Sequence, residues 1–217
     1  MTLSPTESEG PRRRAYDSSR RRAAAAARRQ RVLEVAAERF ATHGWARTTI
    51  AAVAQEAGVS VDLITHTIGT KSELLLAALR ATSFGDEAPD LREAVLGLGL
   101  AELDDVGERL QVLSGFLVRM MAQMMPLIPA LEQAADSSAD ARVMMQGLQV
   151  QRRETTRLML EAITGGPVPE DLIDETMVLT SAPIYLQFVP GLGWRPEQYA
   201  GWLADTMRAA LGRHGVG

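Results

Sequence analysis

Apolar residues recur at intervals of three and four along most of the chain, and this spacing constrains the fold more than any other feature. Leu33, Ala36 and Phe40 follow it near the N-terminus, and Leu113 and Leu117 follow it further along. Such spacing places apolar side chains on one face of a helix, and no stretch shows the alternation that is typical of a strand. The sequence therefore predicts an all-α protein.

Composition excludes several classes of protein. The chain has 217 residues, 46% of them hydrophobic, which is enough to bury a substantial core. It contains no cysteine, and this excludes disulfide scaffolds, thiolate catalysis and cysteine-ligated zinc. No run approaches eighteen uninterrupted apolar residues, and the alanines at 23–27 are too few for a signal peptide. We therefore expect a cytoplasmic protein that does not bind a membrane.

Charge divides the chain into two parts. Residues 1–80 hold 13 lysines and arginines against 8 acidic residues, whereas residues 81–217 hold 10 against 19. A basic end joined to an acidic remainder suggests a polyanion-binding head on a body with another role. The helical patterns, with the breakers Gly85 and Pro89, place the head at 24–84 and the body at 85–217.

The first 23 residues form a separate, arginine-rich arm. The triplets Arg12–Arg14 and Arg20–Arg22 stand among almost nothing apolar, so we expect residues 1–23 to be disordered. Nine arginines lie between Arg12 and Arg31. Such an arm either enters a minor groove or follows the DNA backbone, or it is a solvated tail, and the sequence leaves these alternatives open.

Residues 49–67 have the pattern of a helix-turn-helix. Thr49 and Ser60 can each cap a short helix, and Thr70 with Glu73 forms a capping box for the helix that follows. The second helix of such a pair can lie in the major groove of DNA. The apolar residues that would lock the two helices together are Val53, Ala54, Ala57, Val59 and Ile64. The residues left pointing outward are Val61, Asp62, Thr65 and His66.

Eight residues are predicted to contact DNA. Helix N-termini present free amides and a positive dipole end, so residues beside them are natural phosphate ligands. The predicted set comprises Thr48, Thr49, Ser60, Val61, Asp62, Thr65, His66 and Lys71. For Thr48, Thr49 and Ser60 the alternative is that they only cap helices. For Lys71 the alternative is a solvated side chain. For Asp62 the favoured interpretation is that its carboxylate complements the helix dipole.

The run from Arg31 to Leu74 resembles the DNA-binding domain of tetracycline-repressor-type (TetR) regulators. The residues that carry the resemblance are Phe40, Gly44, Thr48, Thr49, Val53, Ala54, Ala57, Gly58, Val59, Ser60 and Lys71. The resemblance implies about nine helices: an N-terminal three-helix domain and a C-terminal helical domain that dimerises and binds an effector. The chain departs from the family at Thr65 and Ile68, where tyrosine and phenylalanine are usual, and threonine is too short to copy the tyrosine's contact with a phosphate.

Methionines and a pair of prolines mark the body. Six of the ten methionines lie between Met120 and Met145, and Pro126 and Pro129 break the helix there. Methionine suits pockets for varied apolar ligands, although a methionine stripe at helical spacing is more often plain core. The candidate effector pocket comprises Phe116, Met120, Met124, Met144, Leu148, Met159 and Met177.

No pattern favours an enzyme, a cofactor or a metal site. The chain has no phosphate loop, nucleophile elbow or HExxH sequence, and its three histidines are far apart. The sequence instead predicts a dimeric regulator, a ligand-responsive repressor that binds a palindromic double-stranded DNA operator. It would pair through its C-terminal helices and respond to a small apolar effector. The alternative is a helical ligand- or protein-binding dimer that has lost specific DNA binding.

Overall fold

The computed structural model describes residues 11–84 and 91–216, and within these ranges it contains helices and no strand. Nine of the α-helices have seven residues or more, as the all-α prediction of about nine helices requires. The elements in chain order are α1 Pro11–Arg47, α2 Ile50–Ala57, α3 Val61–Thr67, α4 Lys71–Phe84, α5 Leu91–Leu96, the 3₁₀-helix η1 Leu100–Glu102, α6 Val106–Met124, the 3₁₀-helix η2 Met125–Leu127, α7 Ile128–Ser137, α8 Ala139–Thr164, α9 Glu170–Leu179, α10 Ala182–Leu186, the π-helix η3 Gln187–Gly191 and α11 Pro196–Arg213.

Helix α1 begins earlier than the sequence analysis expected. It starts at Pro11, so the prediction of a disordered arm is wrong for residues 11–23, and residues 1–10 lie outside the described part of the chain. Proline suits a first helical position because it has no amide hydrogen to leave unpaired, and alanine and arginine are both good helix formers. At the other end Gly44 has φ 71° and ψ −177°, which breaks the regular helix three residues before α1 ends at Arg47.

The start signals of the next three helices are confirmed. Thr49 Oγ1 accepts a hydrogen bond from Ala52 N at 3.1 Å, and Ser60 Oγ accepts one from Leu63 N at 3.2 Å. The capping box closes in both directions. Thr70 N donates to Glu73 Oε2 at 2.7 Å, and Glu73 N donates to Thr70 Oγ1 at 3.3 Å.

The head has its own hydrophobic core, which takes in part of the body sequence. Its buried residues from α1 to α4 are Val32, Leu33, Val35, Ala36, Phe40, Val53, Ala54, Ile64, Leu74, Leu75, Ala78 and Leu79. Leu127, Ala130, Leu131 and Ala134, from η2 and α7, are buried in the same cluster, as is Ala141 at the start of α8. The expected boundary between 84 and 85 therefore does not separate the two cores, because α7 packs with the head.

The body core lies between α6, α8, α9 and α11. Leu110, Leu113, Leu160, Leu172 and Leu203 are fully buried there. An aromatic cluster closes one end, in which the ring of Phe188 lies 4.5 Å from that of Trp202 and 4.8 Å from that of Trp194, centroid to centroid. α6 packs closely against α11, and α8 packs against α9.

The break predicted at Pro126 and Pro129 is confirmed. α6 ends at Met124, η2 carries Pro126, and α7 begins with Pro129 in its first turn. By length and composition the stretch Val106–Ser137 could cross a membrane, and it is the one such candidate in the described part of the chain. Its apolar residues supply the buried faces of both cores, which accounts for that composition without a membrane.

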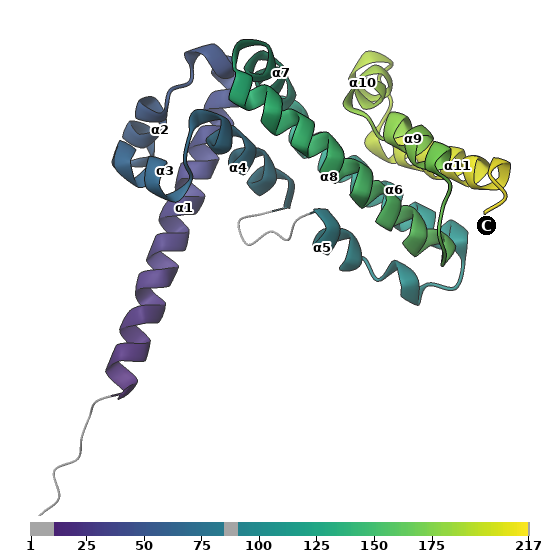
Figure 1. Cartoon of the computed structure of the whole chain (residues 1–217), viewed down its shortest axis with the longest axis horizontal. Coiled ribbons are helices and arrows are strands. Elements are labelled where there is room, and N and C mark those ends of the chain that lie inside the picture. Colours follow the sequence, from purple (N-terminus) through teal and green to yellow (C-terminus); the bar gives the residue numbers. More distant parts are fainter. Residues whose placement is uncertain (1–10, 85–90, 217) are drawn as a thin grey trace, which may run out of the picture.

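Figure 1 shows the arrangement that results. The body, with its long helices α6 and α8, extends to one side of the head. The C-terminal half of α1 is enclosed by α2, α4 and α7, whereas its N-terminal half projects away from the rest of the molecule as a single helix (Figure 1).

Candidate nucleic-acid interface

The helix-turn-helix is held by a small buried wedge. Val53 and Ile64 have no exposed surface, and Ala54 is only 2% exposed. The turn between α2 and α3 passes through Gly58, whose φ of 70° is a left-handed conformation that favours glycine. Val59 N donates to Ala54 O at 3.0 Å and completes the end of α2. These contacts fix α3 across α2 and decide which of its faces meets solvent.

One face of α3 is open to solvent, as the sequence predicted. Asp62, Thr65 and His66 are exposed, and Val61 is 42% exposed, a large value for an apolar side chain. The Thr65 hydroxyl donates to Val61 O or to Asp62 O, each at 3.2 Å, and is therefore turned back on its own helix. The groups that this face presents to a partner are thus one apolar side chain, one carboxylate and one imidazole.

Thr49 and Ser60 are exposed at the N-termini of α2 and α3. Each hydroxyl oxygen accepts a bond from a backbone amide of its own helix. A hydroxyl has one donor as well as its acceptor sites, so the O–H remains able to donate to a phosphate oxygen. Capping and phosphate contact are therefore compatible at both residues.

The structure does not favour a DNA contact for the side chain of Thr48. The residue is only 1% exposed. Its hydroxyl donates to Gly44 O at 2.9 Å or to Arg39 O at 3.1 Å. This hydroxyl closes the kinked end of α1, and the threonine is present for the turn rather than for a ligand.

Lys71 is also tied to the inside of the head. Its Nζ donates to Trp45 O at 2.6 Å and lies 4.0 Å from the centroid of the Trp45 ring. The Trp45 ring is itself stacked on Phe40, with 6.0 Å between centroids. Burial lowers the pKa of Lys71. The amine expected to reach a phosphate therefore bonds the end of α1 to the start of α4.

Sequence analysis missed three polar residues that position this interface. Arg29 donates to Thr67 O at 3.3 Å, which joins α1 to the last turn of α3. Arg39 pairs with Glu56 at 2.7 Å and joins α1 to α2. Gln133 on α7 accepts a hydrogen bond from Trp45 N at 3.1 Å. These contacts join residues 17 to 88 positions apart, so no local spacing could have revealed them.

The seven residues of the predicted effector pocket do not gather in one place. Phe116, Met120, Met159 and Met177 belong to or pack against the body core. Met124 and Met144 pack against the head core instead. The periodicity correctly marked them as inward-facing, but the break after Met124 turns the chain from one core to the other. The seven residues therefore do not form one pocket, and the alternative interpretation as ordinary core describes Met124, Met144 and Met159 better.

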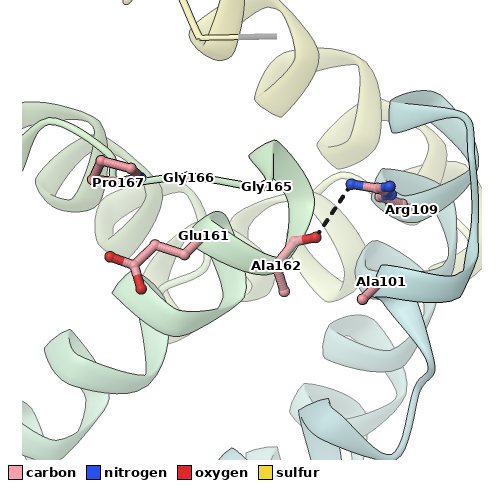
Figure 2. A pocket seen from close by; sticks show the side chains of 7 residues that line it. All are labelled: Ala101, Arg109, Glu161, Ala162, Gly165, Gly166 and Pro167. Carbon is pink, nitrogen blue, oxygen red and sulfur yellow. Dashed lines mark hydrogen bonds between the residues drawn. The ribbon is translucent and has the colours of Figure 1, made fainter.

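A cavity of about 490 Å³ lies elsewhere, at the end of α8 (Figure 2). The residues that line it are Ala101, Arg109, Glu161, Ala162, Gly165, Gly166 and Pro167, and none belongs to the predicted set. Arg109 donates to Leu103 O and to Ile163 O, both at 2.7 Å. Its guanidinium satisfies the last carbonyl groups of α8, so the cationic group of this lining already has a structural role.

Comparison with known proteins agrees with the geometry of the head. Residues 32–78 match the family described as bacterial regulatory proteins, tetR family. Over this range the head has the sequence pattern of a tetR-family DNA-binding domain. The matched range covers the buried part of α1, the helix-turn-helix and most of α4, and the protein is a DNA-binding transcriptional regulator.

Two solved structures resemble the whole fold of this chain. A transcriptional regulator from Rhodococcus sp. Rha1 has a TM-score of 0.56 at 19% identity, over 86% of this chain and 97% of that one. A tetR-family transcriptional regulator from Streptomyces coelicolor has a TM-score of 0.58 at 19% identity, over 87% of this chain and 82% of that one. No curated protein sequence matches the chain. At these identities the likeness shows a shared fold, body included.

Replacing Lys71 with methionine tests its internal role. The methionine keeps the apolar stem but leaves Trp45 O without its charged donor, so the free energy of unfolding should fall by about 1–2 kcal/mol. Urea unfolding without DNA measures the decrease. Lys71→Arg, which can still donate, should keep most of the stability. A Lys71→Met protein as stable as the wild type would show that this bond contributes nothing to the head.

Proposed function

We propose that the protein is a ligand-responsive repressor that binds a palindromic operator as a homodimer in the cytoplasm. The observation that carries the proposal is the exposed face of α3, supported by a fully buried Ile64 and fixed to α1 through Arg29. A helix held in this way can enter a major groove without losing further conformational freedom. The acidic body would pair two such heads.

Specificity and affinity would come from different residues of the interface. Val61 and His66 would face base edges, where a valine can contact a thymine methyl and an imidazole can donate to or accept from a base. Thr49 and Ser60 would donate to phosphates and fix the register of α3. Asp62, beside Val61 in the first turn of α3, would chiefly complement the helix dipole.

His66→Ala should change which operator sequence is preferred. Removing one base contact costs about 1–3 kcal/mol at one position and leaves the other positions unaffected. The measurement selects binding sites for both proteins from a random duplex library and then titrates the selected duplexes. His43→Ala is the matched control, because it removes an exposed histidine that lies on α1 and not on α3. If the wild type selects no sequence at all, the chain is instead a helical ligand- or protein-binding dimer.

Dimerisation would use the exposed apolar side chains of the C-terminal helices. Val178 on α9 is 60% exposed, Leu186 at the end of α10 is 40% exposed, and Leu192 after η3 is 64% exposed. Consecutive elements thus present three large apolar groups to solvent, which is what an interface between two copies would cover. Binding to two half-sites would require a two-fold axis that sets the two α3 helices about one turn of DNA apart.

Val178→Asp with Leu192→Asp should shift the protein to monomers. A carboxylate buried in the interface is costly, so the dimer dissociation constant should rise at least about tenfold. Light scattering across a dilution series measures it, against a monomer mass of 23.5 kDa. Val150→Asp on α8, a site 70% exposed, is the control. If only the Val150→Asp control dissociates into monomers, the interface lies on α8 instead.

The effector response would pass through two connections between head and body. α7 is buried in the head core and follows directly from α6 and η2. α4 leaves the head and packs against α6 and α8, where Arg80 donates to Gln151 at 3.3 Å. An apolar ligand that separated α6 from its neighbours would shift both connections. Phe116 and Met120, half-buried on α6 beside the body core, are the residues we propose for that ligand.

Met120→Lys should remove the response to apolar effectors and leave DNA binding without ligand unchanged. The charge would make an apolar site unfavourable for its ligand. The experiment screens a panel of apolar compounds for those that raise the melting temperature and then measures operator affinity with each. Linkage requires that DNA weaken the binding of the compound by the same factor by which the compound weakens the binding of DNA. Gln123→Lys, on an exposed face of the same helix, is the control, and an unchanged response in Met120→Lys would exclude this site.

A further inference from the structure

The N-terminal half of α1 is a basic helix that the head core does not use. Among the residues of α1 whose burial the structure describes, 20–47, the first buried one is Val32, and residues 20–29 are all exposed. Between residues 12 and 31 the sequence has nine arginines and a single acidic residue, Asp17. We call residues 11–29 the basic helix. The repulsion among its arginines opposes the helical form, so a polyanion that neutralises them would favour it.

The basic helix leaves the head at the end of the recognition helix. Arg29 is bonded to Thr67 O, the last residue of α3. The opposite end of α1 is bonded to α7 through Trp45 and Gln133. The basic helix therefore starts beside α3 and points away from the connection with the body, as Figure 1 shows. At 1.5 Å per residue, the stretch from Pro11 to Arg29 reaches about 27 Å beyond this point.

We propose that the basic helix is a second DNA-binding element, which lies along the phosphate backbone outside the major groove read by α3. This inference rests on the proposed function, because α3 must bring the duplex to the head. A reach of about 27 Å corresponds to about eight base pairs at 3.4 Å per step. Arginine clusters at 12–14, 20–22 and 28–29 recur every eight residues, or about 12 Å, and guanidinium groups pair well with phosphate oxygens.

The composition of the basic helix favours a nucleic-acid backbone over a membrane surface. A helix that binds lipid needs a face of large apolar residues to insert. Between Arg12 and Arg31 the only large apolar or aromatic residue is Tyr16, and the remaining uncharged positions are alanine, serine and glutamine. Small side chains between arginines let the helix approach a phosphate ridge closely. The partner is therefore the duplex flanking the operator half-site.

The test replaces Arg20, Arg21 and Arg22 with glutamine, which keeps good helix propensity and removes three charges. Fluorescence anisotropy on a 40-base-pair duplex that contains the selected operator would give affinity from about 50 to 300 mM salt. The slope of log affinity against log salt should fall by roughly 0.9 for each phosphate that the variant no longer neutralises. Base preference should stay the same, and nuclease protection should shorten by several base pairs on the flanks.

Matched variants make the result specific. Arg92, Arg119 and Arg195, three exposed arginines of the body, changed together to glutamine should leave the slope and the footprint unchanged. Changing residues 20–22 to lysine should keep most of the slope, because the contact is mainly electrostatic. The melting temperatures of the variants at residues 20–22 should stay close to that of the wild type, because these residues lie outside both cores.

Three results would overturn the inference, and each is distinct from failure of the proposed function. An unchanged slope and footprint in the glutamine variant would show that the basic helix does not touch DNA. An equal decrease of the salt slope in the variant with glutamine at Arg92, Arg119 and Arg195 would show that the effect comes from net charge alone. If the wild type binds vesicles of anionic lipid and the glutamine variant does not, while both bind DNA equally, the basic helix binds a membrane and not the duplex. A wild-type protein that binds no duplex would instead refute the proposed function.

Discussion

The burial of α7 against the C-terminal half of α1 is the contact on which the rest of the arrangement depends. Leu127, Ala130 and Ala134 are as deeply buried in the head core as the residues of α1 itself. This contact joins the DNA-binding domain to the body through α7, and it leaves the other end of α1 outside the core. A change in the body that moves α7 must therefore move α1, and α3 follows because Arg29 and the buried Ile64 hold it there.

Polar residues complete this junction and make it specific. The main chain at Trp45 donates to Gln133 and accepts from Lys71, so one residue bonds α1 to both α7 and α4. Hydrogen bonds in such a network fix one relative position of the helices, which apolar burial alone does not do. The resemblance to tetR-family regulators marked Lys71 through its position in the motif. Its contacts indicate that this lysine is needed by the head before any DNA is present.

Local signals predicted much of this structure, and contacts between distant residues account for what they missed. The caps at Thr49 and Ser60, the capping box at Thr70 and the proline break depend on neighbours within four residues, and all could be predicted from the sequence. Burial of Thr48 and the division of the methionines between two cores depend on which helices meet, and periodicity carries no such information. The start of α1 was missed because a shortage of apolar residues suggested disorder, although helix propensity alone favoured a helix there.

The two halves of the charge distribution then act together along the direction of α1. The acidic body would be repelled by DNA, and the basic residues lie at the end of α1 that points away from it. A duplex approaching from solution would meet the basic helix first and be turned toward α3 before any base is read. Such steering needs a defined direction, which a helix continuous with the head provides and a flexible tail of the same composition does not. Because α1 starts early, its arginines are held in a fixed direction relative to α3. They would therefore orient the approaching duplex as well as increase the affinity for it.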